Sequence, residues 1–254
     1  MKKRIQPHIM CGLGDVAEYV LLPGDPKRAE KIATFFDTAE KIADYRGYIT
    51  YSGKVGETPI STCSTGIGCP SAAIVVEELI KIGAKNLIRV GTTGALQPDI
   101  NIGDIIIATA AVRADGTTNA YVPTGFPAVA DFQIVRALIK AAERLGKRFH
   151  LGIVVSSDAF YAENQDFVRS YGEANVLSVE MEASVIFTLT NLKHLGGGAI
   201  LVVDSNLIKG IKKGEFHAGE KTGELDPCVQ KAIEDEIKIA IEAVKILDNS
   251  TEKL

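Results

Sequence analysis

The sequence has no tryptophan, only three methionines and no apolar run near the roughly 20 residues that span a bilayer. Its four cysteines (Cys11, Cys63, Cys69 and Cys228) lack Cys-x-x-Cys spacing and its four histidines are scattered, so we predict no metal site and no disulfide framework. The net charge of −4 is the wrong sign for a nucleic-acid surface. We therefore expect a cytoplasmic protein with neither a membrane nor a nucleic-acid partner.

The 254 residues are 46% hydrophobic and 24% charged, as in an ordinary globular protein. Short apolar runs alternate with helical periodicity, which predicts a single α/β domain over residues 1–254. We expect three layers, with a mixed, largely parallel central sheet flanked by helices. Ligands of such sheets bind beyond the carboxyl ends of the strands. Residues 113–130 are expected to form a loop, and 209–226 are charged and glycine-rich, as in a mobile flap.

Two segments have the composition of phosphate-binding turns. Arg89 ends an apolar run and is followed by Gly91-Thr92-Thr93-Gly94, and a guanidinium beside free backbone N–H groups suits an oxyanion. The alternative is a structural ion pair for Arg89 and a tight turn. At Gly24, Asp25 and Pro26 begin a helix that carries Arg28 near its start, and helix N-termini bind anions. The alternative for Arg28 is a solvated surface.

Carboxylates follow two other predicted strands. Glu180 and Glu182 flank Met181 where a strand gives way to a helix; such acids either accept hydrogen bonds from vicinal hydroxyls or stabilise the first helical turn. Asp204 directly follows the apolar run 199–203. It is a candidate general acid, with a structural cap as the plainer alternative.

A different class of function is suggested by Gly66-x-Gly68-x-x-Ser71, which opens a helix and is close to a dinucleotide-binding fingerprint. Arg89 would then hold the 2′-phosphate of NADP. Serine replaces the third glycine, however, and the motif does not follow the first strand. An NADP-binding oxidoreductase is therefore an alternative to a phosphate-binding enzyme.

Taken together, five stretches give the chain a resemblance to a known family. They are LLPGDPKRAEKI (21–32), RGYITYSG (46–53), IRVGTTGALQPDINIGDII (88–106), VVSSDAFYAENQDF (154–167) and VEMEAS (179–184). As a set they resemble the trimeric or hexameric nucleoside phosphorylases, which include purine nucleoside, methylthioadenosine and uridine phosphorylases. The resemblance implies phosphorolysis, in which phosphate attacks C1′ of a nucleoside and releases the base and ribose 1-phosphate. It implies no cofactor besides phosphate as co-substrate.

The resemblance also implies a role for each matching residue. A homohexamer built as a trimer of dimers is implied, with two of these residues, His8 and Arg46, reaching the site of a neighbouring subunit. The implied sets are Gly24, Arg28, Arg46, Arg89 and Thr92 for phosphate, His8, Met181 and Glu182 for ribose, Phe160, Tyr161 and Glu180 for the base, and Asp204 as the catalytic acid.

Two departures from family patterns bear on the substrate. Bacterial purine enzymes resemble Ser-Asp-His where this chain has Asp204-Ser205-Asn206, whereas protozoan ones share its Val-Asp. Uridine phosphorylases have Gln-x-Arg after Phe-Tyr, and here the stretch is Asn164-Gln165-Asp166. We predict phosphorolysis of purine nucleosides, with methylthioadenosine as a candidate, and uridine phosphorylase as the alternative because GTTGALQ resembles that branch. A non-catalytic nucleoside-binding protein would have no use for the three arginines.

Overall fold

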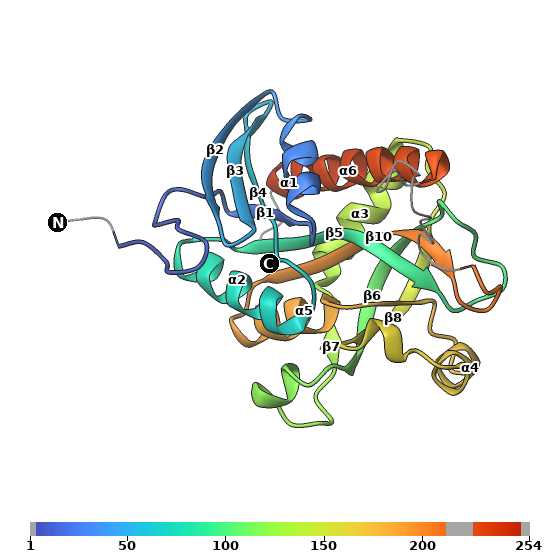
Figure 1. Ribbon diagram of the computed structural model, residues 1–254. Helices are drawn as coiled ribbons and strands as arrows, with labels where there is room; N and C mark the ends of the chain where they lie inside the picture. Colours follow the sequence, from blue (N-terminus) through green and yellow to red (C-terminus); the bar gives the residue numbers. More distant parts are fainter. Residues whose placement is uncertain (1–3, 212–225, 250–254) are drawn as a thin grey trace, which may run out of the picture.

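The computed structural model describes residues 4–211 and 226–249, and ten strands of this part form one sheet (Figure 1). The sheet order is β10-β6-β8-β9-β5-β1-β4-β3-β2, with β7 paired to β6. The strands are β1 (Tyr19–Leu22), β2 (Thr38–Tyr45), β3 (Tyr48–Val55), β4 (Thr58–Cys63), β5 (Asn86–Ala95), β6 (Ile105–Ala114), β7 (Ala128–Val129), β8 (His150–Ser157), β9 (Ser178–Glu180) and β10 (Gly196–Asn206).

Part of the sheet closes on itself. Strand β10 pairs with β6 and also with β5, so that β10, β6, β8, β9 and β5 form a ring, from which β1, β4, β3 and β2 extend. The described pairings divide evenly, five parallel and five antiparallel. The sheet is therefore mixed, and less parallel than the alternating pattern indicated. Strand β3 pairs antiparallel with β2 and β4, β7 does so with β6, and β9 and β10 each pair antiparallel with one neighbour.

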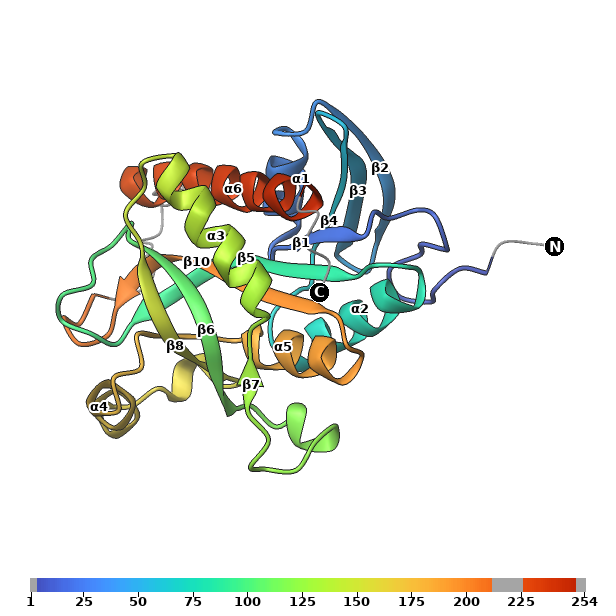
Figure 2. The ribbon, with the colours of Figure 1, turned by 180° about the vertical axis from the view of Figure 1, so that it is seen from behind.

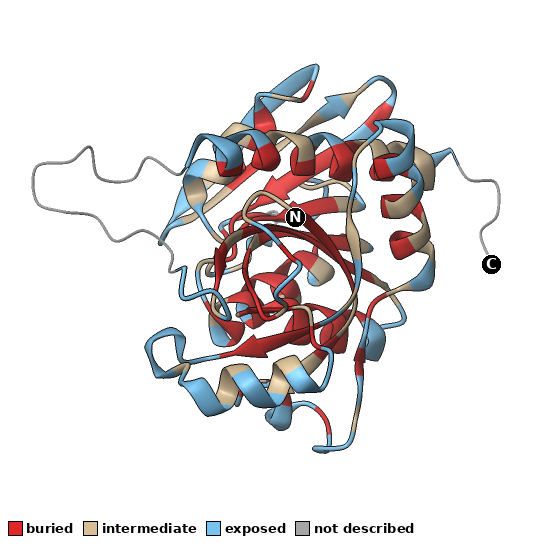
Figure 3. Ribbon diagram, turned by 90° about the vertical axis from the view of Figure 1, so that its right-hand side faces the viewer, coloured by how far each residue is buried: buried red, intermediate tan, exposed pale blue. Residues whose placement is uncertain are grey.

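Helices cover both faces of the sheet and complete three layers (Figures 1 and 2). On one side lie α1 (Pro26–Ala33), α3 (Phe132–Arg144) and α6 (Pro227–Asp248), and on the other α2 (Cys69–Lys81) and α5 (Ala183–Leu192). Burial is concentrated on the strands and on the helix faces turned toward them (Figure 3). None of the described helices is long and apolar enough to cross a membrane.

Local signals placed several of these elements correctly. Asp25 caps α1, with its carboxylate accepting a hydrogen bond from the N–H of Lys27 at 2.9 Å, and Pro26 takes the first helical position. Asp131 caps α3 in the same way. Helix α1 ends at Ala33, where Thr34 closes the last turn: its N–H donates to the carbonyl of Glu30 at 3.3 Å and its hydroxyl to the carbonyl of Lys31 at 2.7 Å.

The structure differs from the sequence-based expectations in several places. Residues 113–130, expected to form a loop, contain the end of β6, a short 3-10 turn (Thr118–Ala120) and strand β7. Gly91–Gly94 does not form the expected turn: strand β5 continues through it to Ala95, because β10 and β9 pair with this stretch on either side. Strand β2 is almost wholly exposed and so lacks an apolar signal. Helix α4 (Gln165–Glu173), capped by Asn164, lies in a polar stretch for which no helix was predicted. The predicted flap at 209–226 lies almost entirely outside the described residues.

Candidate active site

Arg89 lies at the centre of a buried charged cluster. Its side chain is 6% exposed and forms ion pairs with two carboxylates, Nε to Oε2 of Glu180 at 2.7 Å and Nη2 to Oε2 of Glu182 at 2.5 Å. Burial disfavours the charged guanidinium, but Glu182 and Glu180 outweigh it and hold the pKa of Arg89 above its ordinary value. The structural ion pair of Arg89, which was the alternative to anion binding, is therefore present. It joins three of the predicted site residues.

The glycine two residues after Arg89 makes room for its side chain. Residues i and i+2 share a face of a strand, and a Cβ on Gly91 would lie 2.9 Å from Cζ of Arg89. The guanidinium therefore rests on the backbone of its own strand. Gly91 serves this close approach and not a turn.

The two acids of the Val179–Ser184 stretch have different partners. Glu180 accepts hydrogen bonds from the N–H groups of Glu182 at 2.8 Å and Ala183 at 2.9 Å, and from the hydroxyl of Ser156. It thereby stabilises the first turn of α5. Glu182 instead reaches α2, where Oε1 accepts a hydrogen bond from the N–H of Gly68 at 2.5 Å. This helix start, which resembled a dinucleotide site, is thus closed by the protein's own carboxylate.

Gly24 and Arg28 approach this cluster from the first strand. The N–H of Gly66 donates to the carbonyl of Gly24 at 3.1 Å, so the turn after β1 packs on the turn before α2. A Cβ on Gly24 would lie 3.1 Å from the Gly66 carbonyl oxygen, which favours glycine here. Arg28, in the first turn of α1, is half-buried and shares with Arg89 an electrostatic interaction with Glu236. The two arginines therefore converge.

Asp204 sits at an irregularity of β10. Val203 pairs with Thr93 and Ser205 with Gly94, so that Asp204 is the extra residue of a β-bulge. Bulges re-aim side chains next to functional sites. Asp204 is half-buried and accepts a hydrogen bond from the hydroxyl of Ser205 at 3.1 Å, whereas Ser205 is buried. Asp204 as a residue is more exposed than Ser205, although its Oδ2 atom is itself buried.

His8 and Arg46 stand apart from the cluster. Nδ1 of His8 contacts Oε1 of Glu78 on α2 at 2.6 Å. Arg46 is exposed at the turn between β2 and β3, with its guanidinium 5.5 Å from the centre of the Tyr45 ring. Within residues 4–211 and 226–249 of one chain, neither has a hydrogen bond or ion pair with Arg89 or its partners. Their predicted contribution requires a neighbouring subunit.

The predicted base-binding aromatics are also open to solvent. Phe160 and Tyr161 lie in the short helical turn η2 (Phe160–Ala162) before α4, and their rings meet edge to face with centroids 5.1 Å apart. Phe160 is 45% and Tyr161 98% exposed. Met181, beside the Glu180–Glu182 pair, is half-buried.

Sequence reasoning missed Glu236. This residue lies on α6 and is fully buried. A signal was available, because Glu236 falls between Ile233, Ile237 and Ala240 on the apolar stripe of an amphipathic helix. A charged residue in such a stripe needs an explanation.

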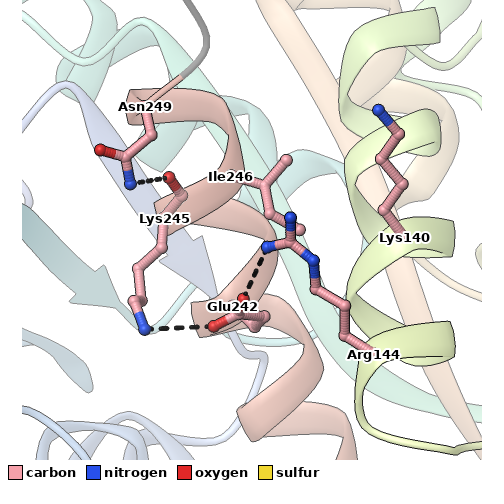
Figure 4. Close-up of a pocket in the computed structure, with 6 residues that line it drawn as sticks. All are labelled: Lys140, Arg144, Glu242, Lys245, Ile246 and Asn249. Atoms are coloured by element: carbon pink, nitrogen blue, oxygen red, sulfur yellow. Dashed lines mark hydrogen bonds and ion pairs between the residues drawn. The ribbon is translucent and has the colours of Figure 1, made fainter.

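A surface pocket lies away from all of these residues, between α3 and α6 (Figure 4). Glu242 occupies it, paired with Arg144 at 3.1 Å and with Lys245 at 3.2 Å. Two of its three basic side chains are thus paired with the same acid, and it contains none of the predicted site residues.

This fold and its charged cluster define a class. The chain belongs to the phosphorylase superfamily, whose sequence model matches residues 18–245. It is an enzyme of the nucleoside phosphorylase family, a pentosyltransferase. The family predicted from the sequence motifs is confirmed.

Its relatives differ in the base that their names specify. The chain is 46% identical over 257 residues to a uridine phosphorylase of Thermococcus kodakarensis, covering 96% of this chain and 87% of that protein. It is 41% identical over 242 residues to a guanosine phosphorylase of Halorubrum lacusprofundi, covering 95% and 99%. The structure of a purine nucleoside phosphorylase from Toxoplasma gondii in complex with immucillin-H superposes with a TM-score of 0.87 at 31% identity, covering 97% of this chain and 98% of that one.

Proposed function

We propose that the protein catalyses reversible phosphorolysis of purine nucleosides to the free base and ribose 1-phosphate. The observation that carries this proposal is the convergence of Arg28 and Arg89 beside a carboxylate, Glu182, that is joined to Arg89 at 2.5 Å. Arginines suit a phosphate, and a carboxylate suits vicinal hydroxyls. One ion pair thus connects a place for phosphate to a place for ribose.

Phosphate binds to Gly24, Arg28, Arg89 and Thr92 in this proposal. The backbone around Gly24 approaches without a side chain in the way, and Thr92 follows on the same strand as Arg89. When phosphate binds, Arg89 donates hydrogen bonds both to the carboxylates and to the phosphate. Glu180, fully buried against Arg89, acts by holding that guanidinium and not by touching the base.

Glu182 binds the ribose 2′- and 3′-hydroxyls, with Met181 against the sugar. Each carboxylate oxygen has two acceptor positions, so the contacts with Arg89 and Gly68 do not by themselves use up those of Glu182. Phosphate attacks C1′ as the bond from C1′ to the base nitrogen breaks. The carboxylate and the phosphate dianion stabilise the positive charge that develops on the sugar.

The departing base takes a proton or a hydrogen bond from Asp204. The β-bulge sets this carboxyl apart from its strand neighbours, in keeping with a general acid whose proton reaches purine N7. Phe160 and Tyr161 cover the base from the η2 turn. His8 and Arg46 complete the site of a neighbouring subunit in a homohexamer, which accounts for their distance from the cluster within one chain.

The purine preference rests on the segment after Phe160 and Tyr161. Oδ1 of Asn164 accepts a hydrogen bond from the N–H of Phe167 at 2.9 Å to cap α4, and Asp166 pairs with Arg169 at 2.6 Å. These positions therefore supply no Gln-x-Arg pair to a pyrimidine. The guanosine phosphorylase relative supports the same preference.

Uridine phosphorolysis is the second candidate. The relative from Thermococcus kodakarensis that carries this name is 46% identical over nearly the whole chain.

A substrate panel tests both proposals. The protein is incubated with inosine, guanosine, adenosine, methylthioadenosine and uridine, with and without phosphate, and free base is measured by chromatography. Phosphate-dependent release from the purine nucleosides is the expected result. Release without phosphate contradicts phosphorolysis, and release from uridine alone contradicts the purine preference.

A further inference from the structure

Glu236 is a fully buried carboxyl group with no evident role in folding. It lies in the middle of α6, which packs on β10, β5 and β4. Among the residues that the structure describes, neither of its side-chain oxygens has a hydrogen-bond partner. Burying a carboxylate without a partner is strongly unfavourable. If packing alone mattered at this position, an apolar side chain would serve the stability of the fold better.

The charged groups around Glu236 come from three elements. Arg28 of α1 and Arg89 of β5 attract a negative charge there, and Asp204 of β10 repels it. The N–H of Gly91 also favours the ionised form, although its geometry falls short of a hydrogen bond. The two acids that precede Glu236 on α6 have bases of their own: Glu234 pairs with Lys31 of α1 and Asp235 with Lys147, which follows α3.

These neighbours oppose one another, and burial decides the balance. Burial raises the pKa of Glu236 to about 8, against the lowering effects of Arg28 and Arg89. At neutral pH the carboxyl is therefore mostly protonated, and it ionises a little above neutrality.

The same two arginines form the proposed phosphate site. Arg89 already faces two carboxylates, Glu180 and Glu182. An ionised Glu236 would be a third negative charge sharing Arg28 and Arg89 with a bound dianion. Like charges that share a buried site disfavour one another's ionised forms. A dianion and an ionised Glu236 therefore exclude each other.

We propose that Glu236 is a positioning residue of the anion site, which interacts with Arg28 and Arg89 and is held protonated while a tetrahedral dianion is bound to them, taking up a proton on binding wherever it was ionised before. This inference rests on the proposed function for the location of the phosphate. Its consequence is a site that favours phosphate near neutral pH and loses affinity in mild alkali, when Glu236 is ionised and Arg28 and Arg89 remain charged.

Isothermal titration calorimetry with sulfate tests the proposal on the full chain. Sulfate is a tetrahedral dianion that does not titrate in this range, so any proton taken up on binding is taken up by the protein. Titrations in two buffers with different ionisation enthalpies give the number of protons. For the wild type we expect about half a proton per sulfate at about pH 8 and nearly one at about pH 9, with about a fivefold loss of affinity between them.

Glu236→Gln keeps the shape of the side chain and cannot ionise. We expect this variant to take up no proton and to bind sulfate equally well at both pH values, about tenfold more tightly than the wild type at about pH 9. Glu234→Gln makes the same change on the same helix at a residue whose side chain is 46% exposed. It is expected to behave as the wild type.

In steady-state assays the effect of Glu236→Gln should fall on the KM for phosphate at alkaline pH and not on kcat. The absence of proton uptake in the wild type, or uptake that persists in Glu236→Gln, overturns the role of Glu236. The wild-type measurement decides this even if the variant does not fold. If neither sulfate nor phosphate binds and base release does not depend on phosphate, the proposed function falls as well. If both anions bind and phosphorolysis is intact, only the role of Glu236 falls.

Discussion

Replacing Arg89 by methionine tests whether the buried cluster is held together by this one cation. Methionine retains a long apolar side chain but leaves Glu180 and Glu182, whose side chains are 0% and 4% exposed, without their shared counter-charge. Removing one partner of a buried ion pair destabilises a protein by about 3–5 kcal/mol, because the remaining charge is buried and uncompensated. Two carboxylates lose their partner here, so we expect the upper part of that range.

Urea denaturation at a fixed protein concentration measures the free energy of unfolding. Far-ultraviolet circular dichroism is the suitable probe, because the chain has no tryptophan. The midpoint should fall without a change in the slope, which reports the surface exposed on unfolding. Arg144→Met is the matched control: Arg144 is also paired with a glutamate, but its side chain is 61% exposed, and we expect a loss of no more than about 1 kcal/mol.

A double variant isolates the electrostatic origin of the loss. Adding Glu180→Gln to Arg89→Met removes one of the stranded charges and should recover about 1–2 kcal/mol of the free energy of unfolding. Equal losses for Arg89→Met and Arg144→Met, or no recovery in the double variant, would refute this reasoning. The cluster would then be relaxed by solvent or by rearrangement, and Arg89 would not be its organising charge.

Three further outcomes are expected. Asp204→Asn should slow release of a purine base by roughly 10²- to 10⁴-fold in single-turnover assays with saturating phosphate, since an amide is no proton donor of comparable strength; an unchanged rate assigns the proton to another group. Gly91→Ala places a methyl group 2.9 Å from Cζ of Arg89. This variant should raise the KM for phosphate by about tenfold with little change in the far-ultraviolet circular dichroism spectrum. An unchanged KM would show that Arg89 can move freely. In the native protein a thiol reagent should modify Cys228 alone among the four cysteines, since the other three are buried; mass spectrometry that finds a second site labelled at the same rate contradicts the described packing.

The sequence by itself determined those features that depend on neighbours along the chain. Asp25 and Pro26 fixed the start of α1, and Asp131 that of α3, because a cap and its helix are only a few residues apart. The alternation of strands and helices gave the fold class, and the motifs around Gly24, Arg89 and Glu182 gave the family.

Tertiary structure decided the rest, because it depends on contacts between distant segments. Gly91–Gly94 has the composition of a turn, and only its pairing with β10 and β9 makes it a strand. Glu180 and Glu182 are two residues apart, yet one stabilises α5 and the other crosses to Gly68, the residue before α2. In the sequence Glu236 is one of several charged residues on a helix. Only the packing of α6 shows that it is fully buried and interacts with Arg28 and Arg89. Which charges share a buried space is set by how the elements pack, and spacing along the chain does not encode it.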